Sequence, residues 1–251
     1  MAGHSKWANI KHKKKKEDRR RGKLFSKLSK KITIAAREGG GDPEYNSNLR
    51  MYIDKAKQNN MPKDNIERAI KKGTGELPGV TYEDAVYEGY GPNGVALYIE
   101  VTTDNTNRTV GELRHILSEY DGNMGEDGSV AWMFDRTGLI YILKEVIGEE
   151  EVTNKAIEAG VEDIEIEDDF YLLYCNPRSF HEVMDSFKES NINIDNSELA
   201  MIPKNTIKLD EDNAKKILNL IDELEDHEDV QNVYANFDID DKIVERILGD
   251  E

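Results

Sequence analysis

Residues 138–202 have the sequence GLIYILKEVIGEEEVTNKAIEAGVEDIEIEDDFYLLYCNPRSFHEVMDSFKESNINIDNSELAMI, and this segment is the most informative about the fold class. Its apolar pattern alternates between the period of a strand and the period of a helix. The elements follow in the order strand (139–143), helix (150–159), strand (163–167), strand (171–175), helix (179–189), strand (198–202). This β-α-β-β-α-β order is that of the ferredoxin-like fold. We therefore expect a complete α+β sandwich domain at residues 137–205.

The segments on either side each hold part of a second α+β domain. Before the stretch, residues 95–101 alternate like a strand with one buried face, residues 110–120 have a helical period, and residues 130–134 suggest another strand. After it, a helix carries Ala214, Ile217, Leu218, Ile221 and Leu224 on one face, and a strand covers residues 230–237. The first part lacks a closing helix and strand, which the second part supplies. We therefore expect a discontinuous domain, residues 80–136 plus 206–239, followed by a C-terminal tail at 240–251.

The N-terminal region predicts three short helices. The first runs from about Lys23 to Arg37 and stops at three glycines; the second opens with Asp42 as N-cap and Pro43 in the first turn. The third starts at Pro62 and ends at Gly73, interpreted as a C-terminal glycine. The expected fold class is thus α+β multidomain: an N-terminal three-helix bundle (22–75) after a basic flexible arm (1–21), then two α+β (ferredoxin-like) sandwich domains, the third inserted in the second.

Charge is divided unevenly along the chain. The first 37 residues hold 14 Lys and Arg against two acids, and residues 1–72 hold 21 basic and 8 acidic residues, a net +13. The other 179 residues hold 13 basic and 43 acidic residues, a net −30, which gives −17 for the whole chain. A concentrated cationic end is typical of nucleic-acid binding, because Lys and Arg displace condensed counterions from phosphates. The alternative is a merely solvated basic tail.

The sequence offers little support for a cofactor site, a metal site or a catalytic site. The hexamer Gly89–Gly94 matches a dinucleotide motif, but a strand follows it where a phosphate site needs a helix, so we interpret it as a turn and expect no cofactor. The acidic loop 121–128 lacks calcium-ligand spacing, and the five histidines are scattered, so we expect no metal and no enzyme. The only cysteine, Cys175, indicates a reducing cytoplasm, and no apolar run is long enough to span a membrane.

Two groups of residues are candidates for nucleic-acid contact. The first is the cationic N-terminal group, in which Trp7 and His4 could stack on bases or hydrogen-bond, while a hydrophobic anchor is the alternative for Trp7. Its members are His4, Lys6, Trp7, Lys11, His12, Lys13, Lys14, Lys15, Lys16, Arg19, Arg20, Arg21, Lys23, Lys27 and Lys30. The second is a possible contact loop with Asn105, Asn107 and Arg108. Helix capping by Asn107 or a threonine is the alternative there.

Several blocks of this sequence are similar to those of the YebC family, whose mitochondrial relatives activate translation of cytochrome c oxidase subunit one. The resemblance rests on MAGHSKWANIKH (1–12), AREGGGDP (36–43), MPKDNIERAIKKG (61–73), YEGYGP (87–92), TDNTNRT (103–109) and GSVAWMFD (128–135). It is dense up to about Gly138 and looser beyond. It implies a helical domain plus two α+β domains, one inserted in the other.

The resemblance also implies a function in gene expression. Members of the family have been regarded as DNA-binding transcriptional regulators and later as ribosome-associated factors that help synthesis of proline-rich stretches. We therefore expect a non-enzymatic, cytoplasmic translation factor that binds ribosomal RNA, with ribosomal proteins as further candidate partners. A DNA-binding transcriptional regulator is the alternative.

Overall fold

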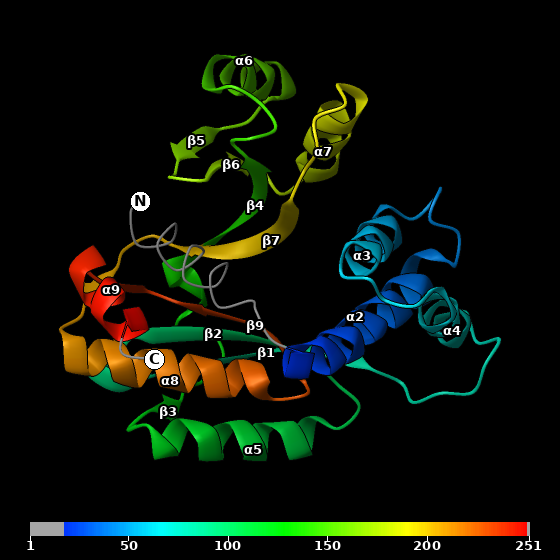
Figure 1. Ribbon diagram of the computed structural model, residues 1–251. Coiled ribbons are helices and arrows are strands. Elements are labelled where there is room, and N and C mark those ends of the chain that lie inside the picture. The colour runs from blue at the N-terminus through cyan, green and yellow to red at the C-terminus, as the bar shows by residue number, and fades with distance from the viewer. Residues whose placement is uncertain (1–17, 250–251) are drawn as a thin grey trace. The chain divides into compact units, whose positions relative to one another are not determined.

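The computed structural model describes residues 18–249, which fall into two compact units (Figure 1). Residues 132–206 make up one unit. The described residues 18–131 and 207–249 make up the other, so its chain is interrupted by the first. Among the described residues, no helix is both long and apolar enough to cross a bilayer. The predicted fold class is confirmed.

The unit of residues 132–206 has the ferredoxin-like order. Its elements are β4 (Phe134–Leu143), α6 (Glu149–Ala159), β5 (Asp163–Ile166), β6 (Phe170–Cys175), α7 (Phe180–Glu189) and β7 (Asn196–Pro203). The sheet order is β5-β6-β4-β7, and all neighbours are antiparallel. The core lies between the sheet and α7, where Gly138 leaves room for the ring of Phe180: a Cβ at this glycine would lie 2.6 Å from the ring.

The strand predicted at residues 130–134 is wrong. Residues Ala131–Met133 form a short 3-10 turn, η2, and the strand starts only at Phe134. The reason is Glu88, whose buried carboxylate accepts hydrogen bonds from the backbone N–H groups of Gly128, Val130 and Ala131 at 2.6–2.7 Å. These donors are therefore not available to a strand partner.

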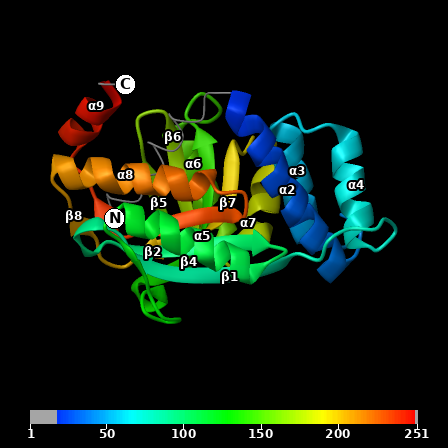
Figure 2. The same ribbon diagram turned by 90° about the horizontal axis from the view of Figure 1, so that it is seen from below.

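The second unit contains a sheet assembled from both of its chain segments. Its elements are β1 (Glu83–Tyr90), η1 (Pro92–Gly94), β2 (Ala96–Thr103), α5 (Thr106–Glu119), β3 (Asn123–Met124), α8 (Glu211–Asp226) and β9 (Val230–Ala235). The sheet order is β3-β1-β2-β9, so the late strand β9 pairs with β2. Helices α5 and α8 pack on each other and cover the same face of this sheet (Figures 1 and 2).

The glycine-rich hexamer is a turn between antiparallel strands. Asn93 and Gly94 have φ angles of 58° and 74°, and Tyr90 pairs with Ala96 on either side of them. Glycine tolerates this left-handed region without steric cost. The chain continues into a strand and not into a helix, so the geometry of a phosphate-binding loop is not formed.

Three helices form the bundle of the second unit: α2 (Asp18–Gly39), α3 (Ser47–Gln58) and α4 (Lys63–Gly73). Buried residues such as Leu28, Ile32, Leu49 and Ile66 form its core. Helix α2 starts at Asp18, so the predicted arm (1–21) is too long: residues 18–21 belong to the helix.

One predicted helix cap is wrong, whereas the predicted end of the third helix at Gly73 is confirmed. Asp42 does not cap α3; its carboxylate accepts the N–H of Glu44 in a turn, and Asn46 caps the helix by accepting the N–H of Leu49 at 3.0 Å. Gly73 is the last residue of α4 and does not have a positive φ angle. It lets α4 approach α2, because a Cβ there would collide with the carbonyl oxygen of Thr33.

The C-terminal segment is not a tail. Strand β10 (Phe237–Asp238) pairs in parallel with β8 (Ile207–Lys208), and helix α9 (Asp241–Gly249) follows. Arg246 of α9 forms a 2.8 Å ion pair with Glu211 at the start of α8. This ion pair holds α9 against α8.

Candidate nucleic-acid interface and the Asp229 junction

One face of α2 carries a row of lysines that are engaged within the protein. Lys23 forms a 3.0 Å ion pair with Asp226, and the Lys27 ammonium donates to the carbonyl oxygen of Glu225 at 2.7 Å. Both partners lie at the C-terminal end of α8, where the helix dipole is negative and attracts cations. The lysine row therefore joins the helical bundle to the α+β domain of the same unit.

Lys30, on the same face, reaches the buried carboxylate of Asp229, whose side chain is 4% exposed. Lys30 lies 2.7 Å from Oδ1 of Asp229, and on Oδ2 the Arg108 guanidinium and the Thr109 hydroxyl each lie at 2.7 Å. The Thr103 hydroxyl adds a contact of 3.1 Å. We call these five side chains the Asp229 junction.

The charge of Asp229 is stabilised by these donors. Burial by itself raises the pKa of the carboxyl, but the hydrogen bonds from Lys30, Arg108 and Thr109 outweigh it and hold the pKa far below its ordinary value. In turn, the hydrogen bond and charge of Asp229 raise the pKa of Arg108. The carboxylate of Asp229 is thus ionised at neutral pH and accepts hydrogen bonds from the other four side chains of the junction.

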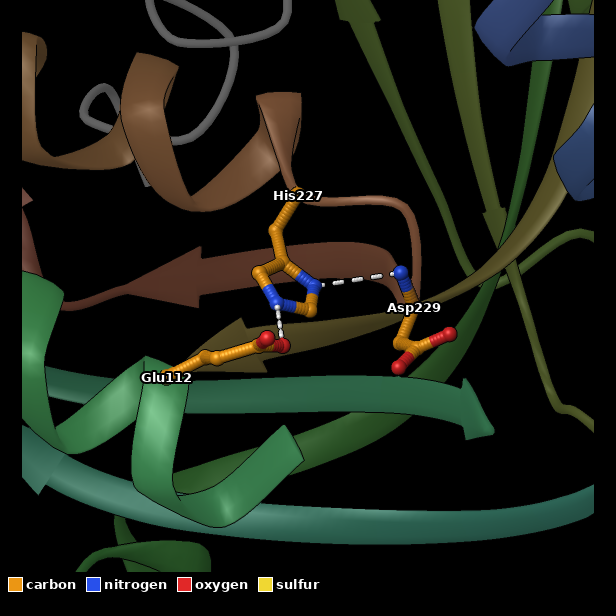
Figure 3. Close-up of side chains that lie close together, drawn as sticks. All are labelled: Glu112, His227 and Asp229. Atoms are coloured by element: carbon orange, nitrogen blue, oxygen red, sulfur yellow. Dashed lines mark hydrogen bonds and ion pairs between the residues drawn. The ribbon is translucent and has the colours of Figure 1, made fainter. Parts of the chain in front are cut away.

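A potential metal-ligand group lies beside the junction. Ligand atoms of Glu112, His227 and Asp229 lie within 4.8 Å of one another (Figure 3). Both ring nitrogens of His227 are occupied, since Nε2 lies 2.9 Å from Glu112 and Nδ1 accepts the backbone N–H of Asp229 at 3.1 Å. Lys30 and Arg108 already balance the charge of Asp229. This donor set favours a structural role over metal coordination.

The predicted contact loop takes part in the junction. Asn105 is the N-cap of α5 and accepts the N–H of Arg108 at 3.1 Å, so the capping expected of Asn107 belongs to Asn105. The Arg108 guanidinium contacts Asp104 at 3.0 Å as well as Asp229. The guanidinium of Arg108, which was a candidate for phosphate binding, therefore binds two carboxylates of the protein.

A hollow lies between α2 and α4 in the same unit. Its volume is about 400 Å³, and the residues that line it include Phe25, Ser29, Lys30, Asn65, Arg68, Lys72, Tyr82 and Glu228. Arg68 and Lys72 are exposed and four residues apart on α4. Among the side chains that the structure describes, neither has an ion-pair partner.

The predicted nucleic-acid residues thus fall into three groups. Outside the described residues lie His4, Lys6, Trp7, Lys11, His12, Lys13, Lys14, Lys15 and Lys16. Arg19, Arg20 and Arg21 lie in the first turns of α2. Lys23, Lys27 and Lys30 bind acidic or carbonyl groups of α8 and its C-terminal connection, and Lys30 in particular is not available to an external phosphate.

Sequence reasoning missed Asp229, His227 and the cations of α4. No spacing rule links Asp229 to Lys30, because the two residues are 199 positions apart. For Arg68 and Lys72 the sequence contains a weak indication of an exposed cationic surface, because both residues lie on the polar face of α4, away from the buried Ile66 and Ala69.

Comparisons with known proteins place the chain in a family. Residues 5–76 match the model of the TACO1/YebC protein N-terminal domain, and residues 82–237 match that of the TACO1/YebC second and third domain. Together these matches cover most of the chain.

Full-length relatives agree with these matches. A probable transcriptional regulatory protein of Halothermothrix orenii is 60% identical over 250 residues, covering 98% of this chain and 99% of that protein. One of the same description from Natranaerobius thermophilus is 58% identical over 248 residues, covering 98% and 99%. The crystal structure of a conserved hypothetical protein, Aq1575, from Aquifex aeolicus superimposes with a TM-score of 0.86 at 45% identity, covering 94% of this chain and 97% of that one. This chain is a member of the TACO1/YebC family.

Proposed function

We propose that this protein is a non-enzymatic, cytoplasmic nucleic-acid-binding factor that acts in translation, docking on ribosomal RNA and assisting synthesis through proline-rich stretches. The observation that carries the proposal is the separation of charge: net +13 in residues 1–72 and −30 in the rest. A polyanion is attracted to the first segment and repelled by the second.

The junction adds a structural argument. Lys23, Lys27 and Lys30 neutralise the acidic end of α8 and hold the bundle against the α+β domain. Arg68 and Lys72 of α4 have no acidic partner among the described residues, and the basic residues of the N-terminal segment are the other candidates for contact with an external partner. The proposed surface therefore consists of the basic N-terminal segment together with Arg68 and Lys72 of α4, without Lys30.

Ribosomal RNA suits this distribution better than a long DNA duplex. A duplex that runs past the cationic end would approach the acidic body, whereas a folded RNA offers local phosphate clusters and unpaired bases. Basic ribosomal proteins are natural neighbours for the acidic domains. DNA-binding transcriptional regulation is the second candidate, and the names of the curated relatives favour it.

Cosedimentation with ribosomes at stepped salt concentrations tests the proposal. We expect binding to fall with salt, and the slope of log affinity against log salt to flatten when Lys13–Lys16 are replaced by alanine. The matched control replaces four lysines of the later chain, Lys204, Lys208, Lys215 and Lys216, and should leave the slope unchanged. Equal slopes for the two quadruple variants would reject the N-terminal segment as the binding element.

Two further measurements separate the alternatives. A sequence-specific footprint on promoter DNA that survives competition by ribosomes would favour the transcriptional candidate. Turnover of RNA by the purified protein, with or without magnesium, would contradict the non-enzymatic assignment.

A further inference from the structure

The hollow between α2 and α4 has the composition of a nucleotide site. About 400 Å³ is within the usual range of ligand pockets, about 300–1,000 Å³. Its border combines two aromatic rings, Phe25 and Tyr82, with the exposed cations Arg68 and Lys72. We infer that this hollow holds one nucleotide of a single-stranded RNA, with the phosphate on Arg68 and Lys72 and the base against Tyr82 or Phe25. The inference rests on the proposed function and names the contact that the helical bundle makes.

The charges of the hollow favour an anion. Lys30 is neutralised by Asp229, and the rim residue Glu228 brings one negative charge. Arg68 and Lys72 remain, and within the described part of the chain they have no acidic partner. Residues four apart on a helix are neighbours on its surface, so both side chains can reach the same phosphate or two consecutive ones.

The uncharged part of the border suits a base and a ribose. No hydrogen bond to a described side chain or backbone group is made by the side chains of Ser29 and Asn65 or by the phenol hydroxyl of Tyr82, so these donors and acceptors are available to a ligand. Aromatic rings stack on unpaired bases without regard to sequence. Hydroxyl and amide groups can hydrogen-bond the 2′-OH, which distinguishes RNA from DNA. The hollow is too small for a duplex but large enough for an unpaired nucleotide.

The neighbouring contacts hold the border of the hollow in place. The hydroxyl of Thr33, which also lines the hollow, donates to the carbonyl oxygens of Ser29 and Ala69 and so links α2 to α4. The ammonium of Lys30 lies 5.5 Å from the ring centre of Tyr82, and Arg37 donates to the carbonyl oxygen of Tyr82 at 2.7 Å. These contacts hold the ring of Tyr82 in place in the absence of a ligand, which reduces the entropy cost of binding.

Fluorescence anisotropy with the full-length protein tests the inference. The probes are labelled twelve-residue oligouridine and oligothymidine strands, titrated at several salt concentrations. The variant Arg68→Gln/Lys72→Gln should bind oligouridine about tenfold more weakly, with a salt slope smaller by about 1.4, because two phosphate contacts are lost from a single strand. The matched control Lys57→Gln/Lys63→Gln removes the same charge from α3 and from the first residue of α4, and it should change affinity less than about twofold.

A second variant tests the base contact. Tyr82→Leu should weaken oligouridine binding by about tenfold and leave the salt slope unchanged, because stacking releases no counterions. If Tyr82→Leu does not fold, the Arg68→Gln/Lys72→Gln variant, whose replaced residues are exposed, still tests whether the hollow binds RNA. Photocrosslinking with a 4-thiouracil-substituted strand should label the peptides that contain Phe25 or Tyr82.

Several results would overturn the inference. They are equal binding by the Arg68→Gln/Lys72→Gln variant and its control, crosslinks confined to residues 1–17, or equal affinity for oligouridine and oligothymidine. If the wild type binds oligouridine and sediments with ribosomes but the hollow variants behave like the control, the hollow is rejected and the proposed function stands. If the wild type neither binds the strand nor sediments with ribosomes, both are rejected.

Discussion

Replacing Asp229 by asparagine tests whether the junction holds the helical bundle to the α+β domain. The change keeps the shape of the side chain and removes its charge, which leaves the 13%-exposed side chain of Lys30 without a counterion. The new amide also turns a donor toward Lys30, Arg108 or Thr109. Breaking a buried ion pair by removing one partner costs about 3–5 kcal/mol, so we expect a loss of that size at pH 7.

The loss should depend on pH with a defined sign. The folded-state pKa of Asp229 lies below its unfolded value, so the carboxylate contributes its full stability above the unfolded pKa, about 3.9. That contribution declines as pH falls toward the folded-state pKa. The difference between wild type and variant should be constant from pH 7 to pH 5 and smaller by about 1 kcal/mol at pH 3.

Urea denaturation followed by circular dichroism measures this difference. With a slope of about 2 kcal/mol per molar urea, the midpoint of the second unit should move down by about 2 M at pH 7. The control is Asp226→Asn, because Asp226 also pairs with a lysine of α2 but its side chain is 62% exposed. Exposed pairs contribute about 1 kcal/mol or less, so this variant should unfold close to wild type. Equal midpoints for the two variants, or a difference that does not shrink at pH 3, would refute the role assigned to Asp229.

Three other predictions follow from buried contacts. Gly73→Ala should destabilise the bundle by about 1–3 kcal/mol in a denaturant titration, because its Cβ would collide with Thr33, whereas Gly111→Ala in α5 meets nothing within 4 Å and should be neutral or stabilising. Glu88→Gln should lower the free energy of unfolding by about 1–3 kcal/mol at pH 7, because the buried carboxylate accepts three backbone N–H groups. These hydrogen bonds hold the pKa of Glu88 below its ordinary value against the effect of burial. The difference in unfolding free energy between wild type and variant should therefore shrink below about pH 4. Burial raises the pKa of the Cys175 thiol to about 11, so the native protein at pH 8 should react with a thiol reagent far more slowly than the urea-unfolded protein does, and equal rates would contradict its burial.

The helices and strands could be predicted from local patterns, because the formation of each depends mainly on residues that are near one another in the sequence. The ferredoxin-like order of residues 134–203 and the inward face of α8 follow from the apolar period alone. An error occurred where a distant side chain intervened: Glu88 draws the N–H groups of residues 128–131 away from a strand. Gly73 ends α4 as predicted, but its role in helix packing depends on a distant contact with Thr33. The short strands β8 and β10, two residues each, leave no periodic signal.

Residue types and their order are enough to establish the fold class, the family and the concentration of positive charge in residues 1–72. Which of those charges have partners follows only from the folded structure. It brings Asp229 to Lys30 and Arg108, residues 199 and 121 positions away, and leaves Arg68 and Lys72 at the edge of the hollow. The physical reason is that the energy of an ion pair depends on distance and burial, and neither is a property of a residue until the chain has folded.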